Sequence, residues 1–287
     1  MSKRLIINAD DFGRTRGVSD GIIRAHTEGI VTSATAMMNM PGVANDLLKA
    51  KAEAPNLGLG VHLTFTAGRP LLPTEWVKSL IDERGSFLSQ EAIIAKPTRI
   101  DTGELESELK AQIKTFKNAM GQLPDHLDAH HFVHIVPQLF ALYLDLADEF
   151  KLPIRIPFPR REEDLSISEQ SPHLIGGARW ATVETLIRAD WELLAIHTVH
   201  TTDRCWLSFH QDGVSLESLL KMLDTLPDGT TELMTHPGLA DDKLKTASTY
   251  NVQREKELAI LTDPQVKARV QELGIELITF GGLGIGD

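Results

Sequence analysis

Short apolar runs alternate with helix-like segments along this chain of 287 residues, and this alternation most constrains the fold. Strand-like runs occur at 5–7, 31–38, 57–65 and 231–234. Between the runs, apolar side chains recur at helical spacing, most clearly over 103–120. About seven strand–helix units follow this pattern, which is typical of an α/β fold with a parallel sheet.

No linker-like stretch interrupts the alternation, so we expect one domain over residues 1–287. Residues 66–101 are irregular and rich in turn-forming proline and glycine, and their length predicts a loop-rich insertion at the active site. Two further short strands are expected at 154–156 and 194–199.

Two adjacent carboxylates, Asp10 and Asp11, follow the first apolar run and precede Gly13. Neighbouring acids repel each other, and they are usually kept at the end of a buried strand because a cation or a catalytic proton needs them. The alternative is an exposed turn that caps the next helix.

Histidines are concentrated between His126 and His134, where four of the chain's 11 histidines accompany Asp128. In a strand, His126, Asp128 and His130 would share one face, which favours a metal site or an acid–base site. His62 lies in another strand-like run, and His236 begins a His-Pro-Gly turn after a further run. One aspartate with two histidines is a common ligand set for a catalytic divalent metal.

Five segments together resemble the YdjC-like carbohydrate deacetylases, also called the chitooligosaccharide deacetylase family. These segments are 7–13, 29–35, 61–64, 126–131 and 235–238, and they come in the family's order. One departure is Phe132, where family members often have a third consecutive histidine. The resemblance implies an irregular (β/α) barrel similar to a TIM barrel. It also implies metal-dependent removal of N-acetyl groups from amino sugars or short N-acetylated oligosaccharides.

On this interpretation, Asp11, His62 and His130 hold one divalent metal ion, Mg²⁺ or Zn²⁺. Asp10 acts as the general base and His236 as the general acid. The roles of Asp10 and Asp11 could be exchanged, because strand alternation puts the two on opposite faces unless a turn begins there.

Three more residues are expected near the substrate. Arg155 either binds a sugar hydroxyl or the acetyl oxygen, or pairs with an acid. Asp128 either orients a histidine ligand or is a buried hydrogen-bond acceptor. His131 is the third, next to His130 in the sequence.

The net charge of −11 disfavours nucleic acids, anionic membranes and polyanionic substrates, so the expected partner is a small neutral N-acetylated sugar. The single Cys205 excludes an internal disulfide and a structural zinc site built on several cysteines. No apolar run approaches the roughly 18 residues of a membrane span, and no signal-peptide pattern opens the chain. We therefore expect a cytoplasmic protein, with a homodimer left open.

Two other functions compete with deacetylation. A metal-containing protein that binds sugars or regulates without turnover is favoured by the histidine missing at Phe132. A different metal-dependent hydrolase is disfavoured, because the first strand carries no His-x-His pair and the chain has no basic cradle for phosphate.

Overall fold

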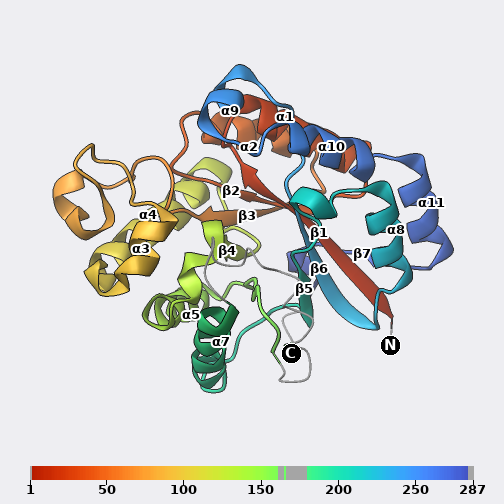
Figure 1. The fold of residues 1–287 in the computed structure, drawn as a ribbon. Coiled ribbons are helices and arrows are strands. Elements are labelled where there is room, and N and C mark those ends of the chain that lie inside the picture. The colour runs from red at the N-terminus through yellow and green to blue at the C-terminus, as the bar shows by residue number, and fades with distance from the viewer. Residues whose placement is uncertain (1, 161–164, 166–179, 284–287) are drawn as a thin grey trace.

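The computed structural model of the protein describes residues 2–160, 165 and 180–283. Its centre is a curled parallel sheet with the strand order β4-β3-β2-β1-β6-β5, and β7 pairs with β1 (Figure 1). The strands are β1 (Lys3–Phe12), β2 (Ser33–Ala36), β3 (Gly58–Leu63), β4 (Leu127–Ala129), β5 (Arg204–Trp206), β6 (Gly229–Thr235) and β7 (Glu276–Leu277).

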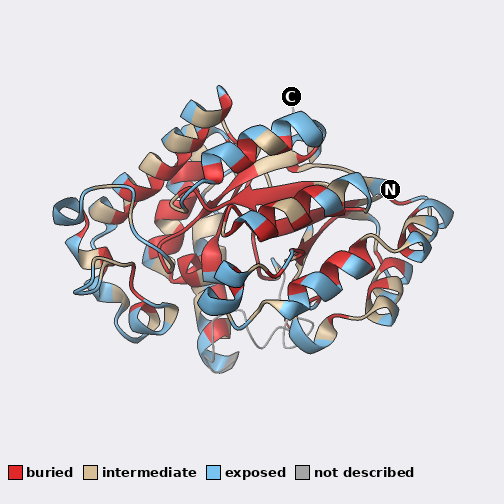
Figure 2. Cartoon of the chain, turned by 90° about the horizontal axis from the view of Figure 1, so that it is seen from above, coloured by how far each residue is buried: buried red, intermediate tan, exposed pale blue. Residues whose placement is uncertain are grey.

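Helices surround this sheet, and Figure 2 shows the central strands almost entirely buried between them. The expectation of an α/β, barrel-like fold is therefore confirmed. The helices are α1 (Arg16–Thr27), α2 (Val43–Glu53), α3 (Gln90–Ala95), α4 (Thr102–Met120), α5 (Pro137–Phe150), α7 (Trp180–Leu194), α8 (Leu216–Asp224), α9 (Asp242–Ala247), α10 (Val252–Leu261) and α11 (Pro264–Glu272). Among these helices, none combines the length and the apolar character needed to cross a bilayer.

Strand β1 lies in the middle of the sheet because both of its faces can be buried. Leu5, Ile6 and Ile7 are fully buried, as a continuous apolar run in a parallel sheet requires. The strand pairs with β2 on one side and with β6 on the other. Its carboxyl end, which carries the two acids, is thus flanked by the carboxyl ends of both neighbours.

Three sequence-based assignments differ from the structure. Residues 154–156 make only a single bridge, between Ile154 and Leu127, rather than a strand. The strand expected at 194–199 is wrong, because the chain turns there after α7 and the next strand is β5. The histidine-rich strand β4 ends at Ala129, and His130 begins the 3₁₀ segment η4 (His130–Ile135).

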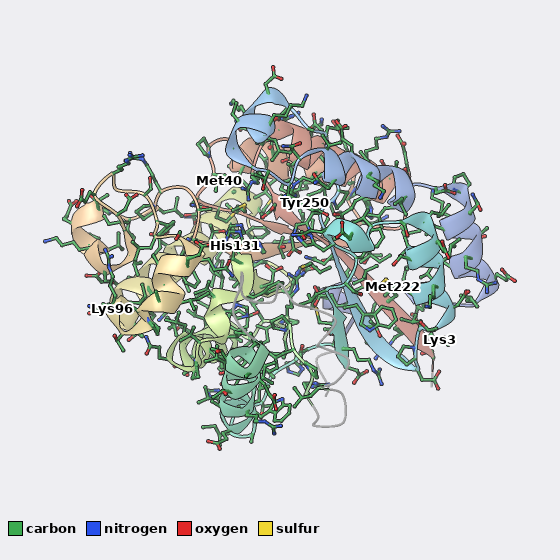
Figure 3. The ribbon with its side chains drawn as sticks, viewed as in Figure 1. Lys3, Met40, Lys96, His131, Met222 and Tyr250 are labelled. Carbon is green, nitrogen blue, oxygen red and sulfur yellow. The ribbon has the colours of Figure 1, made fainter. Side chains whose placement is uncertain are left out.

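The expected irregular region, 66–101, contains helix α3 and the short 3₁₀ turns η1 (Thr74–Trp76), η2 (Lys78–Leu80) and η3 (Pro97–Arg99). Lys96, at the end of α3, lies well away from His131 and the strand ends (Figure 3). The region does contact the segment after β4 at two points, because Thr66 lies 2.7 Å from His130 and Gln90, at the start of α3, donates to His131 O.

Candidate active site

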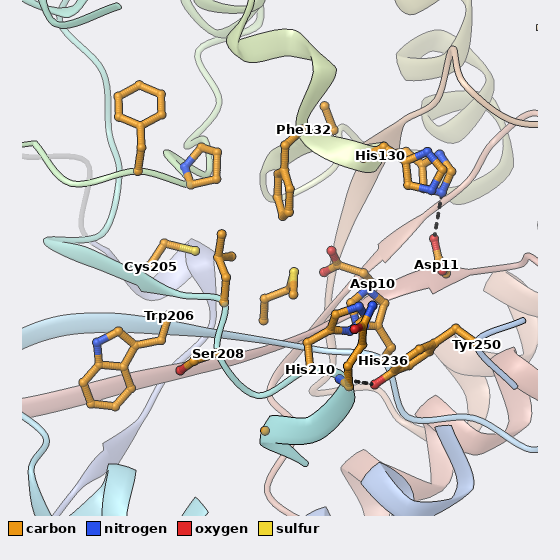
Figure 4. A pocket seen from close by; sticks show the side chains of 18 of the residues that line it. Asp10, Asp11, His130, Phe132, Cys205, Trp206, Ser208, His210, His236 and Tyr250 are labelled. Atoms are coloured by element: carbon orange, nitrogen blue, oxygen red, sulfur yellow. Dashed lines mark hydrogen bonds and ion pairs between the residues drawn. The ribbon is translucent and has the colours of Figure 1, made fainter. Parts of the chain in front are cut away.

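A cavity of about 950 Å³ opens at the carboxyl ends of the strands. This volume lies at the upper end of the range of about 300–1,000 Å³ usual for small-molecule sites. All five residues predicted to bind metal or transfer protons line it: Asp10, Asp11, His62, His130 and His236 (Figure 4). The structure therefore brings together residues from β1, β3, η4 and the position after β6, which are far apart in sequence.

The two adjacent aspartates both reach the cavity because the backbone twists between them. Asp11 has a left-handed backbone with φ of 67°, and the pairing of β1 with β2 shifts register between Ala9 and Phe12. Gly13 is also left-handed, and a β-carbon there would lie 2.4 Å from Val43 Cγ2. The chain therefore turns at this point, which removes the conflict that strict strand alternation poses for the pair.

Asp11 lies between the two predicted histidine ligands. Its Oδ1 is 3.6 Å from Nε2 of His62 and 3.8 Å from Nε2 of His130. Ligand atoms about 2.0–2.1 Å from a tetrahedral metal are roughly 3.4 Å apart, so these separations suit a shared ion. Asp11 Oδ1 is buried and has no hydrogen-bond partner among the described residues. The donor set and this unsatisfied oxygen both fit a divalent cation.

A different combination of groups, Asp10, His62 and Asp128, brings one ligand atom from each residue within 4.8 Å of the others. A guanidinium group already contacts both carboxylates of this combination. Arg155 donates to both oxygens of Asp10 at 2.7 Å and lies 2.8 Å from Asp128 Oδ2. A cation bound there would meet this positive charge directly, whereas Asp11 Oδ1 has no hydrogen-bond partner among the described residues.

Both histidines, His62 and His130, are hydrogen-bonded through Nδ1, the ring nitrogen other than the one nearest Asp11. Asp128 Oδ1 lies 2.6 Å from His62 Nδ1, and Thr66 Oγ1 lies 2.7 Å from His130 Nδ1. Such partners fix the orientation and tautomer of metal-binding imidazoles. Asp128 thus contacts a histidine, as one of the two sequence-based alternatives has it. The contact from Thr66 was not predicted from the sequence. The one feature that could have indicated it is a hydroxyl side chain in the segment after β3.

Arg155 is fully buried and is not among the residues that line the cavity. It forms ion pairs with Asp10, Asp128 and Glu232. The structure therefore shows the acid-pairing alternative, and the arrangement gives no support to direct sugar binding. Burial raises the pKa of Asp10, but Arg155 outweighs burial and lowers that pKa to about 2.

Arg254, on α10, donates from Nη2 to Asp11 Oδ2. Arg14 Nη1 lies 3.5 Å from the same oxygen. Burial raises the pKa of Asp11, yet Arg254 and then Arg14 outweigh it and hold that pKa well below its usual range. Both cations occupy Oδ2, which leaves Oδ1 directed at the histidines. Nothing in the local sequence predicted either partner.

His236 directly follows β6 and lines the same cavity as Asp10. Its backbone N–H donates to Glu257 Oε2 at 2.5 Å, while its ring Nδ1 is buried without a described hydrogen-bond partner. Burial lowers the pKa of His236 to about 3, so its imidazole is neutral. Tyr250 donates its hydroxyl to the other oxygen of Glu257, and burial raises the pKa of Glu257 to about 7.

The two residues that follow His130 also have left-handed backbone conformations, with φ of 62° at His131 and 55° at Phe132. The His131 ring stacks on the His130 ring with centroids 3.6 Å apart. Both residues line the cavity, and Figure 4 shows the Phe132 ring directed into it. Two strained residues in succession are typical of functional sites.

The cavity is more basic than the chain as a whole. Five cationic side chains line it: Arg14, Arg160, Arg204, Lys221 and Arg254. Some are paired, as Arg254 is with Asp11. The net charge of the chain could not predict these cationic side chains in the cavity, because it sums the charges of the whole molecule.

The model of the YdjC-like protein family matches residues 4–272. A carbohydrate deacetylase of Geobacillus stearothermophilus is 35% identical, and the alignment covers 98% of both chains. A chitooligosaccharide deacetylase of Proteus mirabilis is 34% identical over 99% of this chain and 100% of its own length.

Among solved structures, a protein of Enterococcus faecalis V583 proposed to cleave cellobiose phosphate superposes with a TM-score of 0.82. It is 34% identical, and the match covers 99% of this chain and 100% of the other. The similarity thus extends over the whole arrangement of strands that carries the cavity.

Proposed function

We propose, from the premise that the chain belongs to the YdjC-like family, that it is a metal-dependent hydrolase. Its reaction is removal of N-acetyl groups from amino sugars or short N-acetylated oligosaccharides, in keeping with the names of its relatives. The observation that carries the proposal is Asp11 Oδ1, a buried carboxylate oxygen without a hydrogen-bond partner that faces two imidazole nitrogens.

Asp11, His62 and His130 are the residues that would hold the metal. When bound, the ion would polarise the acetyl oxygen and make a water molecule more acidic. Two nitrogen ligands and one oxygen ligand favour Zn²⁺ over Mg²⁺, which prefers oxygen ligands.

We assign Asp10 as the general base, which accepts the proton of the attacking water. Arg155 holds both of its oxygens from behind, and the lowered pKa of Asp10 keeps the carboxylate ionised at neutral pH. Oδ1 also accepts from Asn8 Nδ2 at 2.9 Å, whereas Oδ2 keeps a lone pair beside its bond from Arg155, and the residue lines the cavity. The bidentate contact also prevents the carboxylate from rotating, which favours one direction of proton transfer.

We assign His236 as the general acid, which protonates the departing amine as the carbon–nitrogen bond breaks. A neutral imidazole has to gain a proton before it can donate one. The nearby Asp10 carboxylate offsets part of the lowering of the His236 pKa by burial, which favours that step. The products are acetate and a free amino sugar.

The metal assignment is tested by elemental analysis of variants. His62→Ala and His130→Ala should each lose bound metal, because three protein ligands leave no spare. Chelation should abolish activity in the wild type. Stoichiometric metal retained in the double variant would contradict this ligand set.

The reaction is tested by measuring acetate released from N-acetylated mono-, di- and trisaccharides by the metal-loaded protein. Because five cationic side chains line the cavity, each sugar should be compared with a phosphorylated form. A neutral substrate predicts no gain from the phosphate. Sugar binding without any acetate would favour a non-catalytic binding protein. The cytoplasmic location and the homodimer stay predictions.

A further inference from the structure

A second set of potential ligands lies on the other side of the cavity from His130. His210 precedes the 3₁₀ turn η6 (Gln211–Gly213), His236 follows β6, and Glu257 lies on α10. One ligand atom from each residue lies within 4.8 Å of the other two. We propose that these three residues form a second, weaker site for a transition-metal ion, and that an ion bound there inhibits the enzyme.

The distances suit such an ion after small side-chain movements. Donor atoms of a tetrahedral zinc site are roughly 3.4 Å apart, so each ligand has to move by about an ångström or less. Both histidines are half-buried and line the cavity, whereas Glu257 lies fully buried behind them. The open side toward the cavity leaves room for water as the fourth ligand.

The three groups are already held in place by neighbours. Glu257 accepts hydrogen bonds from the Tyr250 hydroxyl and from the backbone of His236. Each carboxylate oxygen retains a further lone pair for a metal. The His210 ring stacks on Tyr250 with centroids 4.4 Å apart, and it lies 5.2 Å from the His236 ring (Figure 4). Little ordering of side chains is therefore needed on binding.

The electrostatics make this site the weaker of the two. Arg254 lies over the Tyr250 ring, 5.6 Å from its centroid, and repels a second cation. Its charge is partly neutralised by the ion pair with Asp11. Glu257 supplies the only carboxylate among the three ligands, and two imidazoles select Zn²⁺ or Co²⁺ over Mg²⁺.

Inhibition follows from the identity of one ligand, and this step rests on the proposed function. An imidazole nitrogen of His236 that coordinates a metal cannot carry the proton that the departing amine needs. Excess Zn²⁺ should therefore slow acetate release while the first site stays filled.

Zinc binding tests the site without any need for turnover. Titration of metal-free protein with Zn²⁺ alone, followed by calorimetry, should show one tight event and one weaker event. His210→Gln should remove the weaker event and keep the tight one. His197→Gln, at a histidine that contacts Asp148 outside the cavity, is the matched control and should keep both.

The activity measurement adds the inhibitory consequence. In the wild type and in His197→Gln, Zn²⁺ beyond one equivalent should inhibit. In His210→Gln the zinc concentration for half inhibition should rise by more than about tenfold, the scale on which even indirect changes weaken metal sites. Glu257→Gln should behave like His210→Gln. A single binding event in the wild type, or a weaker event that survives in both variants, would overturn the proposal. If no variant releases acetate, the binding titration still decides the site.

Discussion

Backbone geometry at Asp11 decides what each carboxylate of the pair can contact. The left-handed backbone at Asp11 turns its Oδ1 toward His62 and His130, whereas Asp10 remains in extended strand against Arg155. The sequence left the two roles exchangeable, because a strand pattern contains no information about such a turn. The geometry favours Asp11 as the ligand and Asp10 as the base.

Substitution of Asp10 by asparagine should separate the two roles. The amide keeps the shape of the side chain but cannot take a proton, so acetate release should fall by roughly two to four orders of magnitude. The metal content should stay near that of the wild type, measured by elemental analysis alongside the rate. Loss of metal in Asp10→Asn but not in Asp11→Asn would mean that the assignment is reversed.

At the residue scale, short motifs predicted the groups that line the cavity but not their partners. Asp10, Asp11 and His236 follow apolar runs that are recognisable in isolation. Arg254 contacts Asp11 across 243 positions, and Arg155 contacts Asp10 across 145. An arginine on a helix or in a loop is most often a surface residue, so only the fold can reveal such pairs.

At the element scale, hydrogen bonds from helix α4 hold the segment 64–72, which contains the hydroxyl partner of His130. Gln112 donates to Thr64 O and accepts from Thr64 N, and Glu108 accepts from the backbone N–H groups of Leu71 and Leu72. Both helix residues are fully buried. This segment includes Thr66, the hydroxyl partner of His130.

Removal of the Thr66 hydroxyl should therefore weaken metal binding. Thr66→Val keeps the shape of the side chain but leaves His130 Nδ1 without a partner, and the affinity for metal should fall about 10–100-fold. Thr66→Ser restores a hydroxyl and should recover most of the affinity. Calorimetric titration with Zn²⁺ measures the effect at the tight site. Thr115→Val, at a half-buried position on α4 outside the cavity lining, is the matched control.

Metal affinity in Thr66→Val equal to that of the control would show that the contact does not orient the ligand. Helix α4 was predicted from its apolar spacing, but the contact between Thr66 and His130 was not. Strand β5 was missed for a related reason, because three residues with half-buried side chains give too short a pattern to detect.

At the scale of the whole molecule, a buried acid makes stability depend on pH. Asp190, on α7, is fully buried, and neither carboxylate oxygen has a hydrogen-bond partner among the described residues. Burial raises the pKa of Asp190 to about 9. The unfolded chain would release this proton near pH 4, so the folded state binds more protons between about pH 4 and pH 9.

Stability should therefore fall as the pH rises through that window. Asp190→Asn removes the titration, so its free energy of unfolding should exceed that of the wild type by an amount that grows with pH. The gain is at most about 1.4 kcal/mol per pH unit. Urea denaturation at pH 6 and pH 8 measures it, with Asp145→Asn at an exposed position as the control. Equal pH slopes in the wild type and Asp190→Asn would contradict the prediction.

The position of β1 in the sheet also has a consequence during synthesis. One partner, β2, emerges from the ribosome soon after β1, but β6 begins more than two hundred residues later. At roughly 5–20 residues per second, the nascent chain waits on the order of ten to forty seconds before that edge can be paired. During this interval a strongly apolar strand lies open to other chains. A nascent-chain chaperone would therefore bind this protein at its amino-terminal segment, and release from it would depend on translation of the last strands.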